Sequence, residues 1–500
     1  EAIYVFPAST RAAVHGMEMR VGDRVIRARM REKKKARAVY ERAKAAHRTA
    51  SLLEQQRPNV FQMNVANIHP GDEVEVTLRY SETIPAVDGV YEFVYPTVVG
   101  PRFSDHAVGG PATADQWISN PHLMEGEVSP GGFLLELGLT AGMPIQSLSC
   151  PSHQVPVTFD GKASASLRVA GSGAANRDVI VRYQLSDQHI VSGLMLHEGP
   201  DENFFLLNVE PPARVRPEHI PPRDYVFVID VSGSMHGYPL DLAKSLFADL
   251  MGALRPVDSF NILLFAASSE SMARTPLPAT EDNVREGIAF LESRHGGGGT
   301  QLVRALEAAI GLPKDDGRSR SVIVVTDGFI SMEADAFRVL RNKLGQANLF
   351  AFGIGSSVNR HLIEGLAAVG GGEPFVVTRP AEAPVVAKRL RDYVSSPVLT
   401  NIKIEAQGVR LDTMEPGAPR DVFAARPLAI SGRYHGASSG KITVTGTTGG
   451  GEEFRREFPL SEAAARGTEN PALRSLWARE RVRTLADYAH LARGDDEVVR

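Results

Sequence analysis

A cluster of polar side chains directly follows an apolar stretch near the middle of the 500-residue chain. The sequence DYVFVIDVSGSMHG (224–237) places Asp230, Ser232 and Ser234 at every second position. A carboxylate and two hydroxyls at this spacing could cap a helix, or their oxygen atoms could hold a cation. Which of the two applies depends on the side chains that the fold brings beside them.

Two further segments could bring oxygen donors to the same place. The glycine-rich sequence HGGGGTQLVRAL (295–306) carries Thr300 at the start of an expected helix, and the apolar run SVIVVT (321–326) is followed by Asp327. Asp230 also directly follows a short apolar run. In an open parallel sheet, ligands bind outside the carboxyl ends of the strands. We therefore expect both carboxylates at one edge of a sheet, with the glycine loop beside them.

The combined oxygen donors predict a site for a hard divalent cation. The two carboxylates and three hydroxyls belong to Asp230, Ser232, Ser234, Thr300 and Asp327. Oxygen ligands of this kind suit Mg²⁺, with Mn²⁺ or Ca²⁺ as alternatives, and they argue against zinc or copper. Five such groups do not fully enclose the ion. A coordination position should therefore stay open for water or for a carboxylate of a partner.

The elements around these segments indicate a doubly wound α/β domain over residues 223–397. Its expected strands are 225–229, 260–265, 321–326 and 349–354. These strands are apolar throughout and alternate with amphipathic helices such as 240–254. Strands without polar alternation are buried on both faces, which is typical of a mostly parallel sheet covered by helices.

The regions on either side of this domain are rich in antiparallel strands. Residues 72–80 (DEVEVTLRY) alternate between polar and apolar side chains, as half-exposed strands do. Short strands are also expected over 131–210 and 398–460, and we expect these two regions to share one β-sandwich. The proline-rich residues 211–222 indicate a stiff linker, and residues 461–500 are expected to be helical.

Composition excludes several classes of protein. Hydrophobic residues make up 43% of the chain and charged residues 23%, which is typical of globular proteins. The formal net charge of −4 argues against a nucleic-acid-binding protein. No run approaches the roughly 20 apolar residues of a membrane span, so membrane attachment would require an anchor outside this sequence. The single cysteine, Cys150, excludes an intrachain disulfide and a cysteine-rich zinc site.

Residues 20–48 carry a local excess of positive charge. Twelve Lys or Arg residues stand against three acidic residues in this segment. A patch for nucleic acid or another anionic surface is one interpretation. We favour a solvated helix face, because no aromatic residues interleave with the charges as a stacking surface would require. The charged side chains should then point outward and Tyr40 inward.

The three polar segments resemble the metal-ion-dependent adhesion site of von Willebrand factor type A domains. The matching sequences are VIDVSGSM, GGGTQLVRAL and VIVVTDG, and the resemblance covers about 223–397. In that family the serines of the first motif and the threonine bind the ion, whereas the aspartates bind it directly or through water. By resemblance, the first role falls on Ser232, Ser234 and Thr300, and the second on Asp230 and Asp327.

The N-terminal part resembles the VIT domain of inter-alpha-trypsin inhibitor heavy chains, which precedes a type A domain there and in bacterial versions. EAIYVFP, KARAVYERAKAAHRTASLLEQQRPNVFQMNVANIHPGDEVEVTLRY and YEFVYPTVVGPR carry this resemblance, and PSHQVPV and LWARERV extend it over nearly the whole chain. Two departures from the family lie in this N-terminal part. A glycine common near the end of the long helix is His47 here, and the family's strands upstream of EAIYVFP are absent from this sequence.

The resemblance implies a metal-dependent binding module of the cell surface, cell envelope or extracellular space, and not an enzyme. The expected partner is a protein or extracellular-matrix ligand that offers a carboxylate. The expected regions are an N-terminally incomplete VIT-like domain (1–130), a β-rich region with linker (131–222), the type A domain (223–397), a second β-rich region (398–460) and a C-terminally incomplete helical segment (461–500).

An enzyme remains the main alternative. A hydrolase or phosphotransferase with Asp230 as nucleophile usually has a second carboxylate two residues on, where this chain has Ser232. The loop GGGGT lacks the lysine of a P-loop, and AFGIGSSV has Val358 where a dinucleotide loop has its third glycine. A structural envelope protein is a third possibility, against which the full set of oxygen donors argues.

Overall fold

The computed structural model describes most of the chain, which divides into two compact units, Glu1–Leu185 and Ser186–Arg500. The described residues are 2–7, 13–29, 31–57, 60–87, 89–97, 132–171, 173–185, 189–212, 215–315, 317–328, 333–355, 357–436 and 439–489. None of the described helices has the length and apolar character that crossing a membrane requires.

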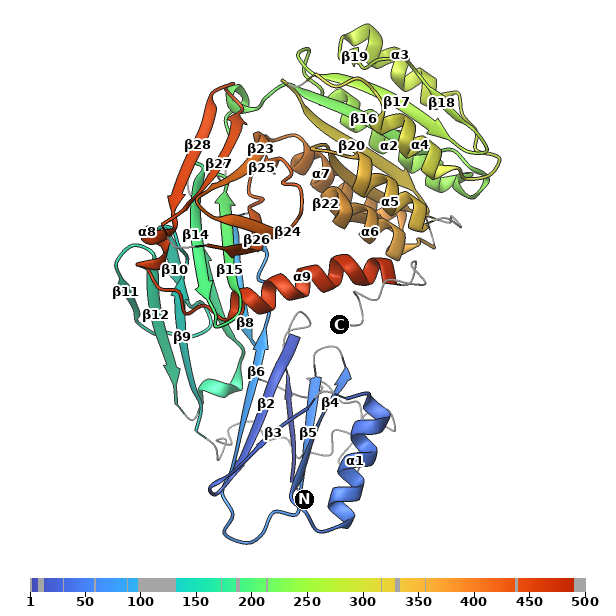
Figure 1. Cartoon of the computed structure of the whole chain (residues 1–500). Helices are drawn as coiled ribbons and strands as arrows, with labels where there is room; N and C mark the ends of the chain where they lie inside the picture. Colours follow the sequence, from blue (N-terminus) through green and yellow to red (C-terminus); the bar gives the residue numbers. More distant parts are fainter. Residues whose placement is uncertain are drawn as a thin grey trace. The chain divides into compact units, whose positions relative to one another are not determined.

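Two three-stranded antiparallel sheets and a helix form the first part of unit 1 (Figure 1). In order of pairing, the strands are β1 (Ala2–Pro7), β5 (Val60–Ala66) and β4 (Ala50–Arg57) in one sheet, and β3 (Arg24–Arg27), β2 (Ala13–Val21) and β6 (Val74–Ser81) in the other. Met19 of β2 packs with Met63 and Val65 of β5 in one buried cluster, so the two sheets share a core.

Helix α1 (Lys33–Ala45) covers part of this unit with Tyr40 pointing inward, as expected. Tyr40 is buried with Leu52 and Ala66, whereas the lysines of the first turn are exposed. The basic side chains of α1 therefore form its solvated face.

His47 ends α1 in the left-handed conformation, with a φ of 53°. The His47 N–H donates to the Lys44 carbonyl (3.1 Å), and the Arg48 N–H donates to the Ala43 carbonyl (3.0 Å). This pair of bonds is a Schellman motif, whose left-handed position usually belongs to glycine. The helix end explains why the family has a glycine where this chain has His47.

Unit 1 also contains two further antiparallel sheets. In order of pairing, the strands are β10 (Ser147–Ser149), β13 (Val179–Gln184), β8 (Val90–Tyr95) and β7 (Ala86–Val87) in one sheet, and β11 (Val157–Asp160), β12 (Ser164–Ala170) and β9 (Leu134–Thr140) in the other. A 3-10 helix, η1 (Ala174–Asn176), precedes β13. Leu167 and Val169 of β12 pack with Val179 and Val181 of β13, so these sheets also share a core.

Strands from both sides of the α/β domain share one β-sandwich in unit 2. One sheet contains β14 (Val191–Glu198), β15 (Asn203–Glu210), β26 (Leu428–His435) and β24 (Arg410–Glu415), and the other contains β25 (Val422–Phe423), β23 (Pro397–Gln407), β27 (Lys441–Thr448) and β28 (Glu453–Pro459). Strand β15 pairs directly with β26, and Phe205 and Ile442 lie in the shared core. The predicted sharing therefore holds for β14 and β15, but residues 134–184 pair within unit 1 instead.

The predicted doubly wound α/β domain is confirmed, with a sheet in the order β18-β17-β16-β20-β21-β22. The strands are β16 (Arg223–Asp230), β17 (Ser259–Phe265), β18 (Ser269–Ser271), β20 (Ser319–Thr326), β21 (Asn348–Ile354) and β22 (Gly371–Val377), with β19 (Leu277–Pro278) beside β17. Strands β17, β16, β20, β21 and β22 run parallel. Every residue of β16, β17, β20 and β21 is buried, as expected for strands covered on both faces.

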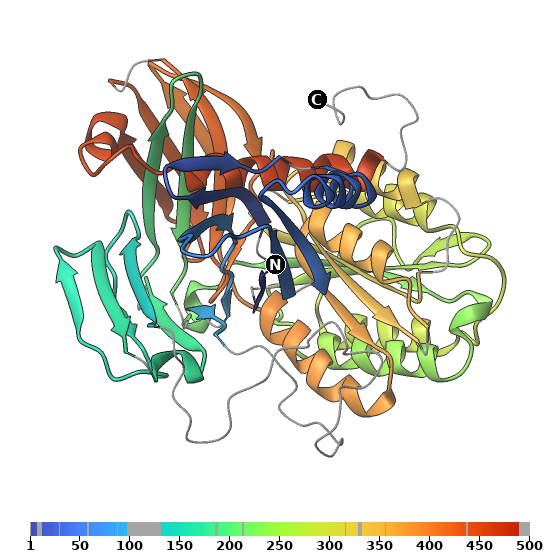
Figure 2. The ribbon, with the colours of Figure 1, turned by 90° about the horizontal axis from the view of Figure 1, so that it is seen from below.

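Helices cover both faces of this sheet (Figure 2). One face carries α2 (Tyr238–Gly252), α3 (Glu281–Glu292) and α7 (Ala383–Val394), and the other carries α4 (Leu302–Ile310), α5 (Glu333–Lys343) and α6 (Arg360–Gly370). Neighbouring residues of β16 divide between the faces, since Phe227 packs in the first cluster and Val228 in the second.

Two helices follow the sandwich, α8 (Leu460–Ala464) and α9 (Ala472–Ala489). The Trp477 ring of α9 packs 5.5 Å from the Phe204 ring, and its Nε1–H donates to the Thr413 carbonyl (2.7 Å). The expected helical segment thus docks on the sandwich, while residues 490–500 lie outside the described part of the chain.

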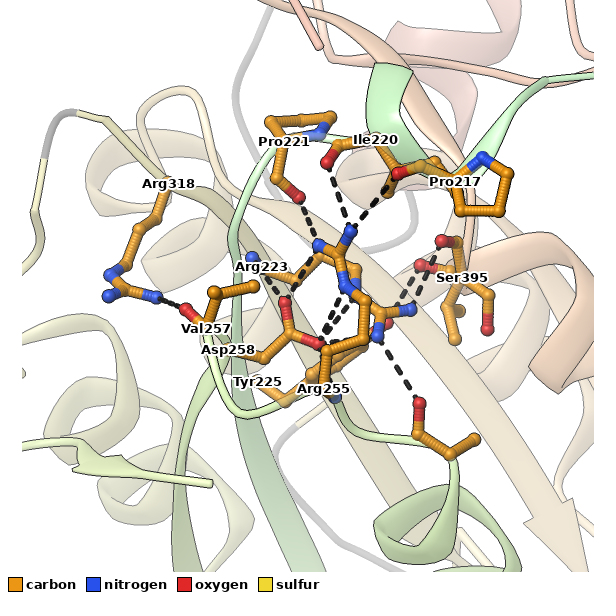
Figure 3. A network of polar contacts seen from close by, with 12 residues as sticks. Pro217, Ile220, Pro221, Arg223, Tyr225, Arg255, Val257, Asp258, Arg318 and Ser395 are labelled. Atoms are coloured by element: carbon orange, nitrogen blue, oxygen red, sulfur yellow. Dashed lines mark hydrogen bonds and ion pairs between the residues drawn. The ribbon is translucent and has the colours of Figure 1, made fainter. Parts of the chain in front are cut away.

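A buried charge network joins the linker to the edge of the α/β sheet where β16 begins (Figure 3). Asp258 accepts hydrogen bonds from the backbone N–H groups of Arg223 (2.9 Å) and Arg255 (2.8 Å) and from both guanidinium groups. Burial opposes ionisation of Asp258, but these hydrogen bonds outweigh it, and the pKa of the carboxyl is lowered. Arg255 also donates to the carbonyls of Ile220 (3.1 Å) and Pro221 (2.6 Å), which anchors the linker.

Candidate metal centre

The polar cluster lies where the strand order of the α/β sheet reverses. After β16 the chain forms β17 on one side and later returns to form β20 on the other. Asp230 is the last residue of β16, and Asp327 directly follows β20. Because β16 and β20 pair in parallel, both carboxylates reach the same edge of the sheet, which is where ligands bind in such folds.

Asp230 is fully buried and held through both carboxylate oxygens. The Ser232 N–H donates to Oδ1 (2.9 Å), and the Thr326 hydroxyl donates to Oδ2 (2.6 Å). Burial, with a smaller contribution from the Asp327 carboxylate, raises the pKa of Asp230, although these hydrogen bonds oppose the rise. A nearby cation would favour the ionised form.

Thr326 connects the two carboxylate-bearing segments. Its fully buried hydroxyl donates to Asp230 and accepts from the Gly328 N–H (3.0 Å). The sequence prediction did not include Thr326. A signal was present, since Thr326 places a hydroxyl directly after the apolar run 322–325.

Ser232 and Ser234 lie side by side in the turn that follows β16, with their Oγ atoms 3.2 Å apart. Ser232 is buried and Ser234 is exposed. The turn is a 3-10 helix, η3 (Gly233–Met235), whose Met235 side chain is buried in the core. No side-chain hydrogen bond from Ser232 caps this helix, and the residue before α2 is Gly237. Helix capping therefore does not account for the two hydroxyls.

The glycine loop 295–299 packs directly against this turn. The Gly297 N–H donates to the Val231 carbonyl (2.9 Å), and the Gly233 N–H donates to the Gly298 carbonyl (3.2 Å). These bonds bring the segment before Thr300 beside the two serines.

Two glycines make this close approach possible. Gly296 and Gly298 have φ values of 77° and 83°, which side chains rarely adopt. A Cβ at Gly296 would also lie 3.3 Å from the Ser232 carbonyl oxygen. Thr300 follows the loop with its side chain half-buried.

Asp327 is buried, and Asn359 fixes the backbone around it. The Asn359 N–H donates to the Asp327 carbonyl (3.0 Å), and Asn359 Nδ2 donates to the Gly328 carbonyl (3.1 Å). Asn359 also accepts from the Leu362 N–H (3.2 Å) and so caps α6. The start of α6 thereby holds the second carboxylate-bearing segment.

The three predicted segments therefore meet at one edge of the sheet. Within the described residues, no group of three or more His, Cys, Asp or Glu side chains could hold a metal. A cation at this edge would rely on hydroxyl oxygens in addition to two carboxylates, and the adjacent serine hydroxyls suit a hard cation of this kind.

Comparison with known families agrees with both resemblances. Residues 1–80 match the Vault protein inter-alpha-trypsin domain (VIT), and residues 223–374 match the von Willebrand factor type A domain. The chain combines a VIT domain with a von Willebrand factor type A domain.

Several curated proteins are similar to most of this chain. Human von Willebrand factor A domain-containing protein 5A is 26% identical over 427 residues, which cover 81% of the chain and 54% of that protein. Human inter-alpha-trypsin inhibitor heavy chain H6 is 23% identical over 494 residues, which cover 95% of the chain and 35% of that protein. Mouse protein mono-ADP-ribosyltransferase PARP4 is 23% identical over 421 residues, which cover 83% of the chain and 21% of that protein. The chain spans about half the length of the first of these relatives.

Two solved structures illustrate the structural likeness. The ArnB paralog VWA2 from Sulfolobus acidocaldarius has a TM-score of 0.45 at 16% identity, covering 62% of this chain and 87% of that one. The von Willebrand factor type A protein from Catenulispora acidiphila has a TM-score of 0.42 at 16% identity, and the match covers 55% of this chain and 74% of that one.

Proposed function

We propose that this chain binds an acidic group of a partner through a divalent cation held at the carboxyl-end edge of the type A sheet. Type A domains are protein-interaction modules, and this chain contains one. The observation that carries the metal-dependent part is the pair of serine hydroxyls, 3.2 Å apart, which lie beside buried Asp230 and cap no helix.

The residues have distinct roles in this proposal. The hydroxyls of Ser232, Ser234 and Thr300 would hold Mg²⁺, with Mn²⁺ or Ca²⁺ as alternatives. Asp230 and Asp327 would supply negative charge, directly or through water. The bound cation would supply the positive charge that attracts a partner's carboxylate.

The proposed setting is the extracellular space or the cell surface, with a protein or matrix component as ligand. The similarity to inter-alpha-trypsin inhibitor heavy chains supports it. We do not expect nucleic acid to be a ligand, because the net charge is −4.

The enzymatic alternative has less support. A nucleophilic Asp230 would need an exposed oxygen, but its side chain is fully buried and both oxygens accept hydrogen bonds. The Ser232 hydroxyl lies beside the Ser234 hydroxyl (3.2 Å), and the Asp230 carboxylate next to it is already held by the Ser232 N–H and the Thr326 hydroxyl. The geometry therefore favours binding over catalysis.

Calorimetric titration with Mg²⁺ tests the proposal. The wild type should release or absorb heat in a saturable manner, whereas Asp230→Ala and Ser234→Ala should bind weakly or not at all. Ser269→Ala, which changes another exposed serine of the same domain, is the matched control and should bind like wild type. Equal heats for wild type and Asp230→Ala would exclude the site.

A second experiment addresses the partner. The chain should retain proteins from an extracellular-matrix extract in Mg²⁺ and lose them in chelator, and Ser234→Ala should retain none in either condition. Retention that is insensitive to chelator and to Ser234→Ala would show that binding does not pass through the cation.

A further inference from the structure

Lys244 of α2 reaches the end of α3 without contacting any of the proposed metal ligands. Its side chain is 13% exposed. The ammonium group donates to the carbonyls of Glu292 (3.1 Å) and Arg294 (2.8 Å). One largely covered ammonium group thus ties two backbone carbonyls just before the glycine loop, and it also pairs with the Glu292 carboxylate (3.7 Å).

The first of these bonds completes the C-terminus of α3. A helix leaves its last four carbonyls without partners inside the helix. In α3, the Ala289 carbonyl accepts from the Ser293 N–H (3.1 Å), and the Phe290 carbonyl accepts from the Ser293 hydroxyl (2.9 Å). The Leu291 carbonyl accepts from the Arg294 N–H (3.0 Å), and the Glu292 carbonyl accepts from the Lys244 ammonium group (3.1 Å). A cation at this end also offsets the negative end of the helix dipole.

The second bond fixes the start of the glycine loop. Arg294 directly precedes residues 295–299, and glycines restrict their own backbone very little. The hydrogen bonds of Gly297 and Gly298 to the turn after β16 hold the middle of the loop, and contacts at its two ends restrict the rest. At the far end, the Gln301 N–H donates to the Ala266 carbonyl (2.9 Å), and Nε2 donates to the Ala267 carbonyl (2.6 Å). At the near end, Lys244 provides one anchor, and His236 Nδ1 provides a second through the His295 carbonyl (3.0 Å).

We propose that Lys244 is a positioning residue for the metal site, which holds the loop so that Thr300 faces the cation. This inference rests on the proposed function, because it takes Thr300 as a ligand. Lys244 acts through the carbonyls of Glu292 and Arg294 and through the loop that they begin. Residues that position metal ligands in this way affect metal affinity although they never touch the metal.

Lys244→Met tests the proposal, because it keeps the apolar stem and removes the donors. Lys343→Met is the matched control, since Lys343 is an exposed lysine of the same domain that pairs with the Glu307 carboxylate (2.8 Å). Lys244→Arg keeps a cation with several donors and should restore much of the wild-type behaviour.

Two readouts separate this inference from the proposed function. Without metal, hydrogen exchange should accelerate over residues 295–301 in Lys244→Met but not in Lys343→Met. In a Mg²⁺ titration, Lys244→Met should bind about tenfold more weakly than wild type. Both are measured well below the melting temperature, and Lys244→Gln replaces Lys244→Met if the latter does not fold.

Unchanged loop exchange overturns the inference. So does faster exchange with unchanged affinity, because Lys244 would then serve only the stability of α3. Equal effects in Lys343→Met overturn it as well. If wild type itself binds no Mg²⁺, the proposed function fails, and the exchange measurement still decides whether Lys244 holds the segment that carries Thr300.

Discussion

Thr326 shows at the scale of a single residue how the site depends on a group outside the predicted set. Replacing it by Val keeps its shape but removes the donor to Asp230 Oδ2, which is fully buried. The loss should cost about 1–3 kcal/mol in the free energy of unfolding. It should also raise the pKa of Asp230 further and weaken Mg²⁺ binding, because the carboxylate becomes harder to ionise.

Chemical denaturation and Mg²⁺ titration of Thr326→Val measure both effects. Thr326→Ser, which retains the hydroxyl, is the control and should bind Mg²⁺ nearly as wild type does. If Thr326→Val and Thr326→Ser behave alike, the hydroxyl does not orient Asp230.

His47 carries a second prediction at this scale. Its φ of 53° is unfavourable for a residue with a side chain and natural for glycine. His47→Gly should therefore raise the free energy of unfolding by up to about 1 kcal/mol. His47→Ala keeps the strain and should give no gain, so equal stability of the two variants in thermal denaturation would contradict this explanation.

The sequence identified the five candidate ligands because each stands in a short motif at a strand end or loop. It did not identify Thr326 or Lys244, because their roles depend on partners in other segments. Thr326 contacts Asp230, which lies 96 residues away, and Lys244 contacts Arg294, which lies 50 residues away. No local pattern encodes such pairs.

At the scale of elements, β25 contributes to the core of the type A domain although it belongs to the sandwich. The Phe423 ring lies 5.6 Å from the Phe350 ring and 5.3 Å from the Tyr393 ring. Phe423→Ala should cost about 3–5 kcal/mol in the free energy of unfolding, as other buried Phe→Ala changes do. Phe159→Ala is the control, because Phe159 is 50% exposed. Similar denaturation midpoints for both variants would show that the type A core is complete without β25.

Asp421 directly precedes β25 and also joins this segment to the type A domain, which gives a pH-dependent prediction. Its carboxylate accepts from the Ser319 hydroxyl (2.6 Å) and from Asn348 Nδ2 (2.9 Å). Burial raises its pKa, although these hydrogen bonds oppose the rise. At pH values between the unfolded pKa of an aspartate, near 3.9, and the higher pKa of Asp421 in the folded protein, the Asp421 carboxyl is ionised only in the unfolded chain. Stability should therefore fall as pH rises through this window and stay reduced above it.

The comparison with Asp421→Asn isolates this effect, since asparagine does not titrate. The stability of wild type relative to Asp421→Asn should decrease as pH rises above about 4 in denaturation experiments. A difference that is constant over this range would mean that Asp421 has an ordinary pKa.

The sequence predicted the elements of the type A domain well and the sandwich less well, for a physical reason. Strands buried on both faces contain continuous apolar runs, 225–229 in β16 and 322–325 in β20, so these strands were visible directly. In half-exposed strands, alternation shows which face is buried but not which strand lies alongside. The pairing of β15 with β26 therefore could not be separated from pairings within 134–184.

At the scale of the whole molecule, the charge distribution gives a prediction about partners. Several basic side chains of residues 20–48 already form salt bridges with acidic side chains. Examples are Arg27 with Glu18 (3.1 Å) and Arg37 with Glu54 (2.5 Å). We expect no tight, strongly salt-dependent binding of DNA, which fluorescence anisotropy at two salt concentrations would measure. Nanomolar affinity that falls steeply with salt would refute this prediction.

The charge network at the start of β16 determines how the molecule would respond to tension. A partner held through the proposed cation at Asp230 would pull on one end of β16, while Arg223 secures the other end through Asp258 and the Ser395 carbonyl (3.1 Å). The pull then runs along a central strand with a parallel neighbour on each side. Hydrogen bonds perpendicular to a force are loaded in shear and must break together. A pull along β16 would therefore load the hydrogen bonds to β17 and β20 together.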